Sequence, residues 1–220
     1  DPRHYRSIKI TRKNKNNPLL IGEPGVGKSR LFYEFIHSHR TQGWLILESR
    51  CVSYGTTTPY LPLTDLLKAY FRIRERDDPR DVREKITGKV LTLDEALQPA
   101  IPALLALLDV PVEDSRWEML DPPARRRRTL DAARHLFVRE SQRHPIILVF
   151  EDLHWIDAET QAFLDLLVDG IPAARLLLLV NYRPEYQSSW PGKSHCTQLR
   201  IDPLPRQNAE ELLASLLGAG

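Results

Sequence analysis

Eight residues near the start of the chain, GEPGVGKS at positions 22–29, carry the clearest chemical signal in the sequence. They match the pattern G-x-x-x-x-G-K-[ST], in which the glycines let successive backbone N–H groups curl around a phosphate without interference from side chains. In such a loop the lysine reaches the β- and γ-phosphates of a nucleotide, and the last hydroxyl ligates Mg²⁺. The residues expected to bind the nucleotide through this Walker A motif are Gly22, Glu23, Pro24, Gly25, Val26, Gly27, Lys28, Ser29 and Arg30.

Two acidic residues, Glu151 and Asp152, directly follow the apolar run at 146–150. A buried strand that ends in acids, as in a Walker B motif, delivers carboxylates to the carboxyl edge of a parallel sheet, where phosphates bind. One carboxylate can hold hydrated Mg²⁺, and its neighbour can orient or deprotonate the attacking water. We therefore expect Ser29, Glu151 and Asp152 to be the residues associated with the metal ion.

Five short apolar runs are predicted to be strands that position these groups, and helical patterns lie between them. The strands are expected at 19–21, 44–48, 146–150, 176–180 and 198–201. Helices are expected at 28–39 and at 209–217. A third helix is expected to begin at a cap on Asp121 and to run to about residue 144. A fourth is expected over 158–169, with Asp157 as its N-cap and Gly170 after its end. The alternation predicts an α/β fold with a parallel sheet. Residues 54–120 contain several prolines and no convincing strand, which indicates a helical insertion between strands two and three.

The composition is that of an ordinary globular chain of one domain, with 220 residues of which 42% are hydrophobic. No apolar run approaches the length of a membrane span, and the N-terminus lacks a signal-peptide core. Cys51 and Cys196 show no pairing or metal-binding pattern, which favours a cytoplasmic location. The net charge of +2 is concentrated in a basic segment, residues 1–17, while the rest of the chain is slightly acidic. Nucleic acid is therefore not an expected partner of this domain.

Two further segments, EDLHWID at 151–157 and NYRPE at 181–185, resemble the signal-transduction ATPases with numerous domains. These AAA-type, origin-recognition-like ATPases occur in large transcriptional regulators and beside bacterial adenylate and guanylate cyclase domains. The segments YG at 54–55 and PYLP at 59–62 add to the resemblance, which runs from about residue 18 to the end of the chain. It implies a P-loop NTPase three-layer sandwich whose fourth strand lies between the P-loop strand and the acid-bearing strand.

The resemblance also implies roles for individual residues. By position, Glu151 takes the Mg²⁺-associated place, Asp152 the water-activating place, and Arg183 the place of an arginine that reads the γ-phosphate. Most AAA relatives have Asp first and Glu second, so the division of labour between the two acids stays open. Trp155 is expected to serve packing, and His154 is given no catalytic role. The four arginines at 125–128 cover every face of a helix, so we expect most of them to meet water.

The chain departs from the family pattern at both ends. Residues 1–17 do not resemble the segment that usually helps to hold the adenine, and we expect them to form a disordered tail. The ATPase core is expected at 18–203, and residues 204–220 are expected to begin a helical lid that is cut off at Gly220. The pattern at both ends therefore predicts a fragment of a longer protein that binds nucleotide weakly and hydrolyses it slowly.

These patterns bear on three possible functions. The favoured one is an ATP-binding, slowly hydrolysing switch that uses Mg²⁺, contacts other domains of its parent chain and is open to homo-oligomer formation. A P-loop kinase acting on a small molecule is the first alternative, and the segments at 151–157 and 181–185 argue against it. An origin-type DNA-binding ATPase is the second, and the slightly acidic body argues against it. GTP is not expected, because the chain contains neither Asn-Lys-x-Asp nor Asp-x-x-Gly.

Overall fold

A computed structural model of the chain describes residues 17–187 and 189–203, and every structural statement below concerns these residues. The predicted tail at 1–16, the helix predicted at 209–217 and the predicted lid at 204–220 lie outside them. None of the helices within the described ranges is both long enough and apolar enough to cross a membrane.

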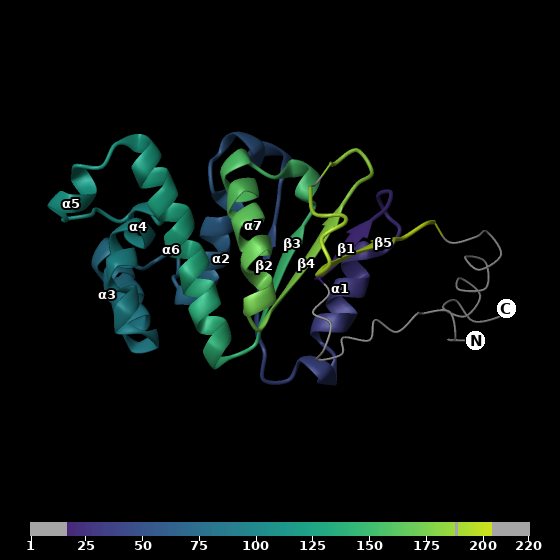
Figure 1. The fold of residues 1–220 in the computed structure, drawn as a ribbon, viewed down its shortest axis with the longest axis horizontal. Coiled ribbons are helices and arrows are strands. Elements are labelled where there is room, and N and C mark those ends of the chain that lie inside the picture. Colours follow the sequence, from purple (N-terminus) through teal and green to yellow (C-terminus); the bar gives the residue numbers. More distant parts are fainter. Residues whose placement is uncertain (1–16, 188, 204–220) are drawn as a thin grey trace.

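The centre of the fold is a five-stranded sheet in which every neighbouring pair is parallel (Figure 1). The strand order is β2-β3-β4-β1-β5, so β4 lies between the P-loop strand β1 and the acid-bearing strand β3, as expected. The strands are β1 (Asn17–Ile21), β2 (Leu45–Arg50), β3 (Ile146–Glu151), β4 (Leu176–Tyr182) and β5 (Cys196–Arg200).

Strands β2 and β4 each extend two residues beyond the predicted ends at positions 48 and 180. The additional residues include Arg50 and Asn181, which are polar and so do not continue an apolar run. They are held in the sheet by ladder pairing, with Arg50 opposite Glu151 and Leu20 opposite Asn181. Hydrogen bonding to the neighbouring strand thus sets the strand ends, and these extensions matter for the site.

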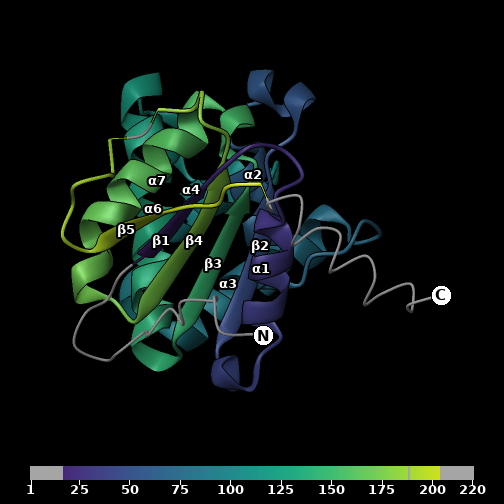
Figure 2. The same ribbon diagram turned by 90° about the vertical axis from the view of Figure 1, so that its right-hand side faces the viewer.

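Helices pack on both faces of the sheet, which gives the three-layer arrangement seen in Figure 2. Helix α1 covers one face, and α2, α6 and α7 lie on the other. The α-helices are α1 (Lys28–Ile36), α2 (Leu61–Phe71), α3 (Pro79–Leu93), α4 (Ile101–Leu107), α5 (Ser115–Glu118), α6 (Pro122–Arg143) and α7 (Ala158–Gly170). Short 3₁₀ segments are η1 (His39–Thr41), η2 (Ser53–Thr57), η3 (Glu95–Ala100), η4 (Leu153–Trp155) and η5 (Ile171–Ala173).

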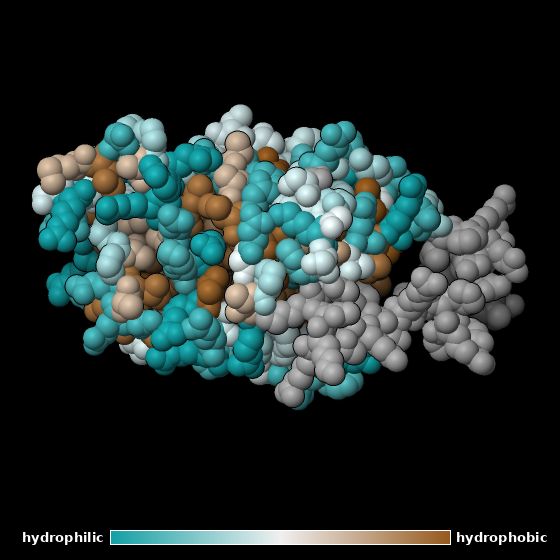
Figure 3. All heavy atoms as spheres, in the orientation of Figure 1, coloured by the Kyte–Doolittle hydropathy of each residue, from teal (hydrophilic) through white to brown (hydrophobic). Residues whose placement is uncertain are grey.

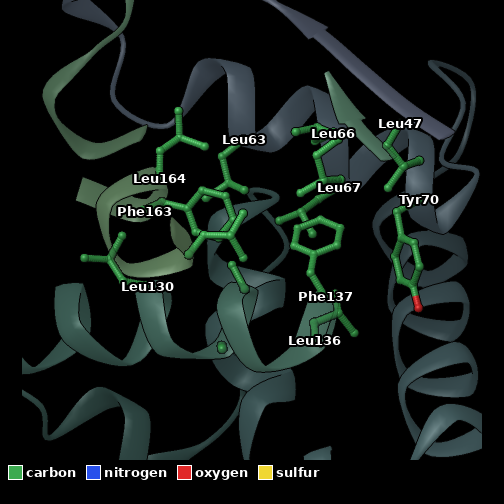
Figure 4. Close-up of a cluster of buried hydrophobic side chains, with 14 of the residues drawn as sticks. Leu47, Leu63, Leu66, Leu67, Tyr70, Leu130, Leu136, Phe137, Phe163 and Leu164 are labelled. Carbon is green, nitrogen blue, oxygen red and sulfur yellow. The ribbon is translucent and has the colours of Figure 1, made fainter. Parts of the chain in front are cut away.

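Strand β3 shows why the sheet is covered on both faces. Its alternate residues Ile147 and Val149 pack beneath α1, while Leu148 and Phe150 point into the larger core on the other face. All of its apolar side chains are fully buried, as expected for a central parallel strand. Figure 4 shows part of the larger core, where side chains from α2, α6 and α7 interdigitate. The labelled residues are Leu47, Leu63, Leu66, Leu67, Tyr70, Leu130, Leu136, Phe137, Phe163 and Leu164.

The predicted insertion between strands two and three is helical. The chain leaves β2 and forms α2, α3, η3, α4 and α5, and α6 then leads back to β3. Helices α3, α4 and α5 lie at the end of the molecule away from the sheet (Figure 1). Within this part the buried hydroxyl of Tyr70 donates a hydrogen bond to Glu140 Oε2 at 2.6 Å, which joins α2 to α6. Burial raises the pKa of Tyr70 and keeps the phenol protonated as the donor.

Two predicted helix ends are wrong by a small number of residues. Helix α1 stops at Ile36 rather than position 39, because Ser38 Oγ and Thr41 Oγ1 donate to the free carbonyls of Phe35 and Ile36. Helix α7 includes Gly170, which has a right-handed backbone with φ −87°, and then continues directly into η5. Gly170 is therefore the last residue of α7, and it does not end the helix in a left-handed conformation.

The buried cap of α7 gives a test of the fold. One carboxylate oxygen of Asp157 accepts the N–H groups of Tyr60, Glu159 and Thr160 at 2.9–3.0 Å, whereas Asp121, the exposed cap of α6, accepts that of Ala124. We expect Asp157→Ala to lower the free energy of unfolding by roughly 2–3 kcal/mol and Asp121→Ala by about 1 kcal/mol. Urea unfolding of both variants is the measurement. Equal losses would show that the contact with Tyr60 does not stabilise the fold.

Candidate functional site

The loop between β1 and α1 depends on glycine at two positions. A Cβ atom on Gly22 would lie 2.3 Å from the carbonyl oxygen of Ile201, so only glycine fits between these two backbone segments. Gly27 is the N-cap of α1 and has φ +88°, in the left-handed region that glycine adopts without strain. The loop therefore turns sharply at both ends and leads directly into the N-terminus of α1, where unpaired N–H groups favour an anion.

The Lys28 side chain is folded back over this loop. Its Nζ donates to the carbonyl oxygens of Gly22 at 2.6 Å and Glu23 at 2.8 Å, and the residue is only 8% exposed. Burial lowers the pKa of Lys28, while the Asp152 carboxylate opposes this change. The ammonium group is thus held against the loop, within electrostatic reach of the Asp152 carboxylate.

The structure brings Ser29 and the two acids to the same edge of the sheet. The Ser29 hydroxyl donates a hydrogen bond to Glu151 Oε2, which joins α1 to the end of β3. Asp152 follows with φ +58°, a left-handed conformation that Asp tolerates better than most residues. Its backbone turns the chain away from the strand direction, so the carboxylates of Glu151 and Asp152 occupy different positions around the phosphate loop.

Asn181, near the end of β4, connects the two acids and was not among the predicted site residues. Its Nδ2 donates to Glu151 Oε2 at 3.0 Å, and its Oδ1 accepts the backbone N–H of Asp152 at 2.8 Å. The residue is 1% exposed. A signal was available in the sequence, because Leu177, Leu179 and Asn181 alternate on one side of the strand and place a polar group where the strand leaves the core.

Arg50, the last residue of β2, is the second residue at the candidate site that was not among the predicted site residues. Its Nε donates to Asp152 Oδ2 at 2.9 Å, and its side chain is 65% exposed. The predicted strand ended at position 48, which left this residue outside the expected sheet. Side chains alternate between the two faces along a strand, so Arg50, four residues after Ile46, lies on the same side of the sheet as Ile46 and α1. Continuing the strand pattern past position 48 would have predicted this.

These side chains surround a pocket of about 370 Å³ at the carboxyl edge of the sheet. Its lining residues are Pro24, Gly25, Gly27, Lys28, Ser29, Arg30, Arg50, Asp152, Asn181 and Arg183. Among the predicted site residues, Gly22, Glu23, Val26 and Glu151 do not line it, although Glu151 is bonded to Ser29 at its margin. Arg183 is 37% exposed in its side chain, and its Nη1 lies 4.0 Å from Glu185 Oε1. Such a weakly held guanidinium is free to meet an anion in the pocket.

The pair Ser29 and Glu151 is the part of the site that suits a metal ion. Hydroxyl and carboxylate oxygens are ligands that Mg²⁺ accepts, and this ion usually takes one or two carboxylates plus phosphate and water oxygens. Within residues 17–187 and 189–203 there is no group of three or more His, Cys, Asp and Glu residues that could hold a metal by itself. The residues present therefore fit Mg²⁺ that arrives together with phosphates.

The segment after the acids, η4, presents His154 and Trp155. Both ring nitrogens of His154 are buried and have no hydrogen-bond partner among the described residues. Burial, reinforced by the positive charge of Arg183, lowers the pKa of His154, so the ring is held neutral. Trp155 is 37% exposed and lies 5.1 Å from the His154 ring, so its expected packing role is only partly fulfilled.

The four arginines at 125–128 lie at the surface, as expected for consecutive positions on a helix. Hydrophilic side chains predominate along α6 on the face shown in Figure 3. Arg126 is engaged within the fold, because its Nε donates to both carboxylate oxygens of Glu159 at 3.0 and 2.7 Å. None of the four lines the nucleotide-sized pocket.

Two curated proteins are similar to this chain in sequence. An uncharacterized protein of Rhizobium meliloti (strain 1021) is 25% identical over 187 residues, and the match covers 84% of this chain and 18% of the relative. The chaperone protein ClpB of Malacoplasma penetrans (strain HF-2) is 30% identical over 89 residues, which cover 40% of this chain and 13% of ClpB. The chain thus spans less than one fifth of the length of these curated relatives.

A solved structure of the Drosophila origin recognition complex, ORC, bound to DNA aligns with 88% of this chain and 85% of its own at 14% identity, with a TM-score of 0.40. The family model described as the AAA ATPase domain matches residues 5–180. This range begins within the basic N-terminal segment and includes the phosphate loop, the insertion and both acids. The protein therefore belongs to the AAA ATPase domain family.

Proposed function

We propose that this chain is an ATP-binding and slowly ATP-hydrolysing switch domain of a larger multidomain signalling protein, of the type that accompanies cyclase domains or transcriptional regulators. The observation that carries the enzymatic part is the single pocket in which Lys28, Ser29 and Asp152 meet. The resemblance at 151–157 and 181–185 supports the signalling part. The small share of the curated relatives that this chain covers is in keeping with a module of a longer protein.

In this proposal the phosphates of ATP lie over the N-terminus of α1. Backbone N–H groups of the loop bind the β-phosphate, and Lys28 turns from the carbonyls of Gly22 and Glu23 towards the β- and γ-phosphates. Ser29 and Glu151 hold the Mg²⁺ side of the nucleotide. When bound, Mg²⁺ neutralises the charge that develops on the phosphate oxygens.

The Asp152 carboxylate is the candidate base for hydrolysis. A water oxygen attacks the γ-phosphorus, the bond between that phosphorus and the β–γ bridging oxygen breaks, and the products are ADP and inorganic phosphate. Asp152 orients the water and accepts a proton from it, because its carboxylate lines the pocket and is 29% exposed. Arg183, on the β4 side of the pocket, binds the γ-phosphate and so distinguishes ATP from ADP.

The loop lysine provides the most direct test. Lys28→Ala should weaken Mg-ATP binding about ten- to a hundredfold, because it removes a charge-assisted contact to the phosphates. Isothermal titration calorimetry with Mg-ATP is the measurement. Lys89→Ala is a matched control, because Lys89 is also a lysine that donates to a backbone carbonyl and whose pKa is lowered by burial, but it lies in α3. If both variants bind ATP like the parent chain, the nucleotide-site assignment is wrong.

The two acids should separate into binding and turnover roles. Glu151→Gln should weaken Mg²⁺-dependent nucleotide binding, because it removes the charge beside Ser29. Asp152→Asn should retain binding and lose turnover, because a water-orienting group acts mainly in the transition state. Single-turnover hydrolysis rates and nucleotide dissociation constants for both variants decide this. The opposite pattern would mean that the two acids exchange roles.

Asn181 should behave as a positioning residue. Asn181→Ala removes the carboxamide that joins Glu151 to the backbone of Asp152, and we expect turnover to fall about 10–100-fold. Asn17→Ala is a matched control, since Asn17 is also 1% exposed and bridges two backbone groups, but at the opposite end of β1. Both variants should lose stability in urea, whereas turnover per folded molecule should fall in Asn181→Ala alone. An equal fall in both would make Asn181 merely structural.

A further inference from the structure

Three polar residues of α7, Gln161, Asp165 and Asp169, lie at intervals of four along the helix. This spacing places their side chains on one face. Each of them accepts a hydrogen bond from the chain between β4 and β5. The donors, in the same order, are the hydroxyl of Tyr186, the indole N–H of Trp190 and the ammonium group of Lys193. The chain that follows Arg183 is therefore attached to α7 at three points.

The side chain of Arg183 depends on its backbone for its direction. Its ion pair with Glu185 is long, at 4.0 Å, and exposed to water, so it stabilises one rotamer only weakly. The backbone is held on both sides. The preceding residue, Tyr182, is paired with Ile21 of β1, and the N–H of Tyr186 donates to the Arg183 carbonyl oxygen at 3.0 Å. The turn that Tyr186 closes therefore aims Arg183 at the pocket that it lines.

The Tyr186 hydroxyl belongs to a network in which each donor meets an acceptor. Asp165 Oδ1 accepts the N–H of the fully buried Trp190 at 2.7 Å and the Nε2 of Gln161 at 3.0 Å. Because the amide nitrogen of Gln161 is committed to a carboxylate, its Oε1 is left to accept the Tyr186 hydroxyl. Burial raises the pKa of Tyr186 and keeps this donor protonated. The network therefore specifies one arrangement of the turn, since another would leave a polar group without its partner.

We propose that Tyr186 is a positioning residue for Arg183, and that its hydroxyl, held by Gln161, fixes the turn that aims the arginine at the γ-phosphate. This inference rests on the proposed function, in which Arg183 distinguishes ATP from ADP, and it names the residue on which that distinction depends. The Tyr186 ring lies 5.1 Å from the Tyr182 ring and can pack without the hydroxyl. The hydroxyl is what ties the turn to α7. Without it, ATP must order the turn as it binds, which costs conformational entropy.

The test compares affinities for two nucleotides in the full 220-residue chain. Tyr186→Phe should weaken binding of a non-hydrolysable ATP analogue, AMP-PNP, by about three- to tenfold. The ADP affinity should stay within about twofold, because ADP lacks the γ-phosphate that Arg183 meets. Gln161→Leu removes the acceptor on the α7 side and should give the same change. Fluorescent-nucleotide competition at fixed salt and Mg²⁺ is the measurement. If neither variant changes the ratio of the two affinities, the proposal is wrong.

A double-mutant cycle shows whether Tyr186 acts through Arg183. Arg183→Ala alone should weaken AMP-PNP binding about ten- to a hundredfold and leave the ADP affinity within about twofold. Once the arginine is gone, its position no longer matters, so adding Tyr186→Phe should change the ratio of the two affinities no further. Additive losses in the double variant would mean that Tyr186 acts independently of Arg183, which contradicts the proposal.

A matched control separates positioning from a general loss of stability. The Tyr70 hydroxyl also donates to a helix side chain, that of Glu140 at 2.6 Å, and burial also raises the pKa of Tyr70, but this contact joins α2 to α6. Tyr70→Phe should lower the free energy of unfolding and leave both nucleotide affinities unchanged. An equal change of the affinity ratio in Tyr70→Phe and Tyr186→Phe would overturn the proposal.

The failure of this inference can be told apart from the failure of the proposed function. If Arg183→Ala changes the affinity ratio while Tyr186→Phe and Gln161→Leu do not, Arg183 keeps its proposed role and the positioning role of Tyr186 is wrong. If Arg183→Ala leaves the ratio unchanged, the role of Arg183 is wrong, and the inference that rests on it is wrong too.

Discussion

The alternation of side chains along three parallel strands is the constraint on which the site depends. Residues of β3 and β4 that lie beneath α1 are apolar until the strands reach the carboxyl edge, where the same side of each strand carries Glu151 and Asn181. Strand β2 adds Arg50 in register with Glu151. Successive side chains of a strand point to opposite faces of the sheet. If one of these strands shifted by one residue against its neighbour, its polar side chain at the carboxyl edge would point into the larger core. Packing of α1 therefore fixes the register, and the register gathers the polar groups at the N-terminus of that helix.

Within this arrangement, two adjacent carboxylates are kept in different environments. Glu151 is hydrogen-bonded by Ser29 and Asn181, which suits a group that stays in place beside a metal ion. Asp152 is turned out of the strand by its left-handed backbone, a conformation that costs free energy for a residue other than glycine. The hydrogen bond from its N–H to the buried Asn181 offsets that cost. Two acids that are neighbours in sequence can thus hold different roles, because one buried carboxamide sets the position of both.

The sequence predicted the phosphate loop and the acids because glycine spacing and a strand ending in carboxylates are local patterns. It also predicted the five-stranded sheet, and the resemblance at 151–157 and 181–185 implied the place of β4. Arg50 and Asn181 were missed because strands were recognised by apolar runs, whereas hydrogen bonding carries β2 and β4 into polar residues. The end of α1 was missed because it depends on Ser38 and Thr41 side chains that bind carbonyl groups after the helix. The expected roles of the acids and of Arg183 stay predictions.

The segment that carries Asp152 also anchors the helical insertion, and this supports the switch role that we propose. From Asp152 the chain passes through η4, whose Leu153 is fully buried, and reaches Asp157 at the cap of α7. Asp157 holds the backbone N–H of Tyr60 at the start of α2, and the Tyr60 hydroxyl donates to Glu159, the partner of Arg126 in α6. A displacement at Asp152 is therefore opposed by the partly buried contacts of Tyr60 at the start of α2 and by the exposed contact between Glu159 and Arg126 of α6. Packed elements move as units rather than deforming continuously. A displacement of the acids therefore either moves α2 and α6 as well or is prevented by their contacts.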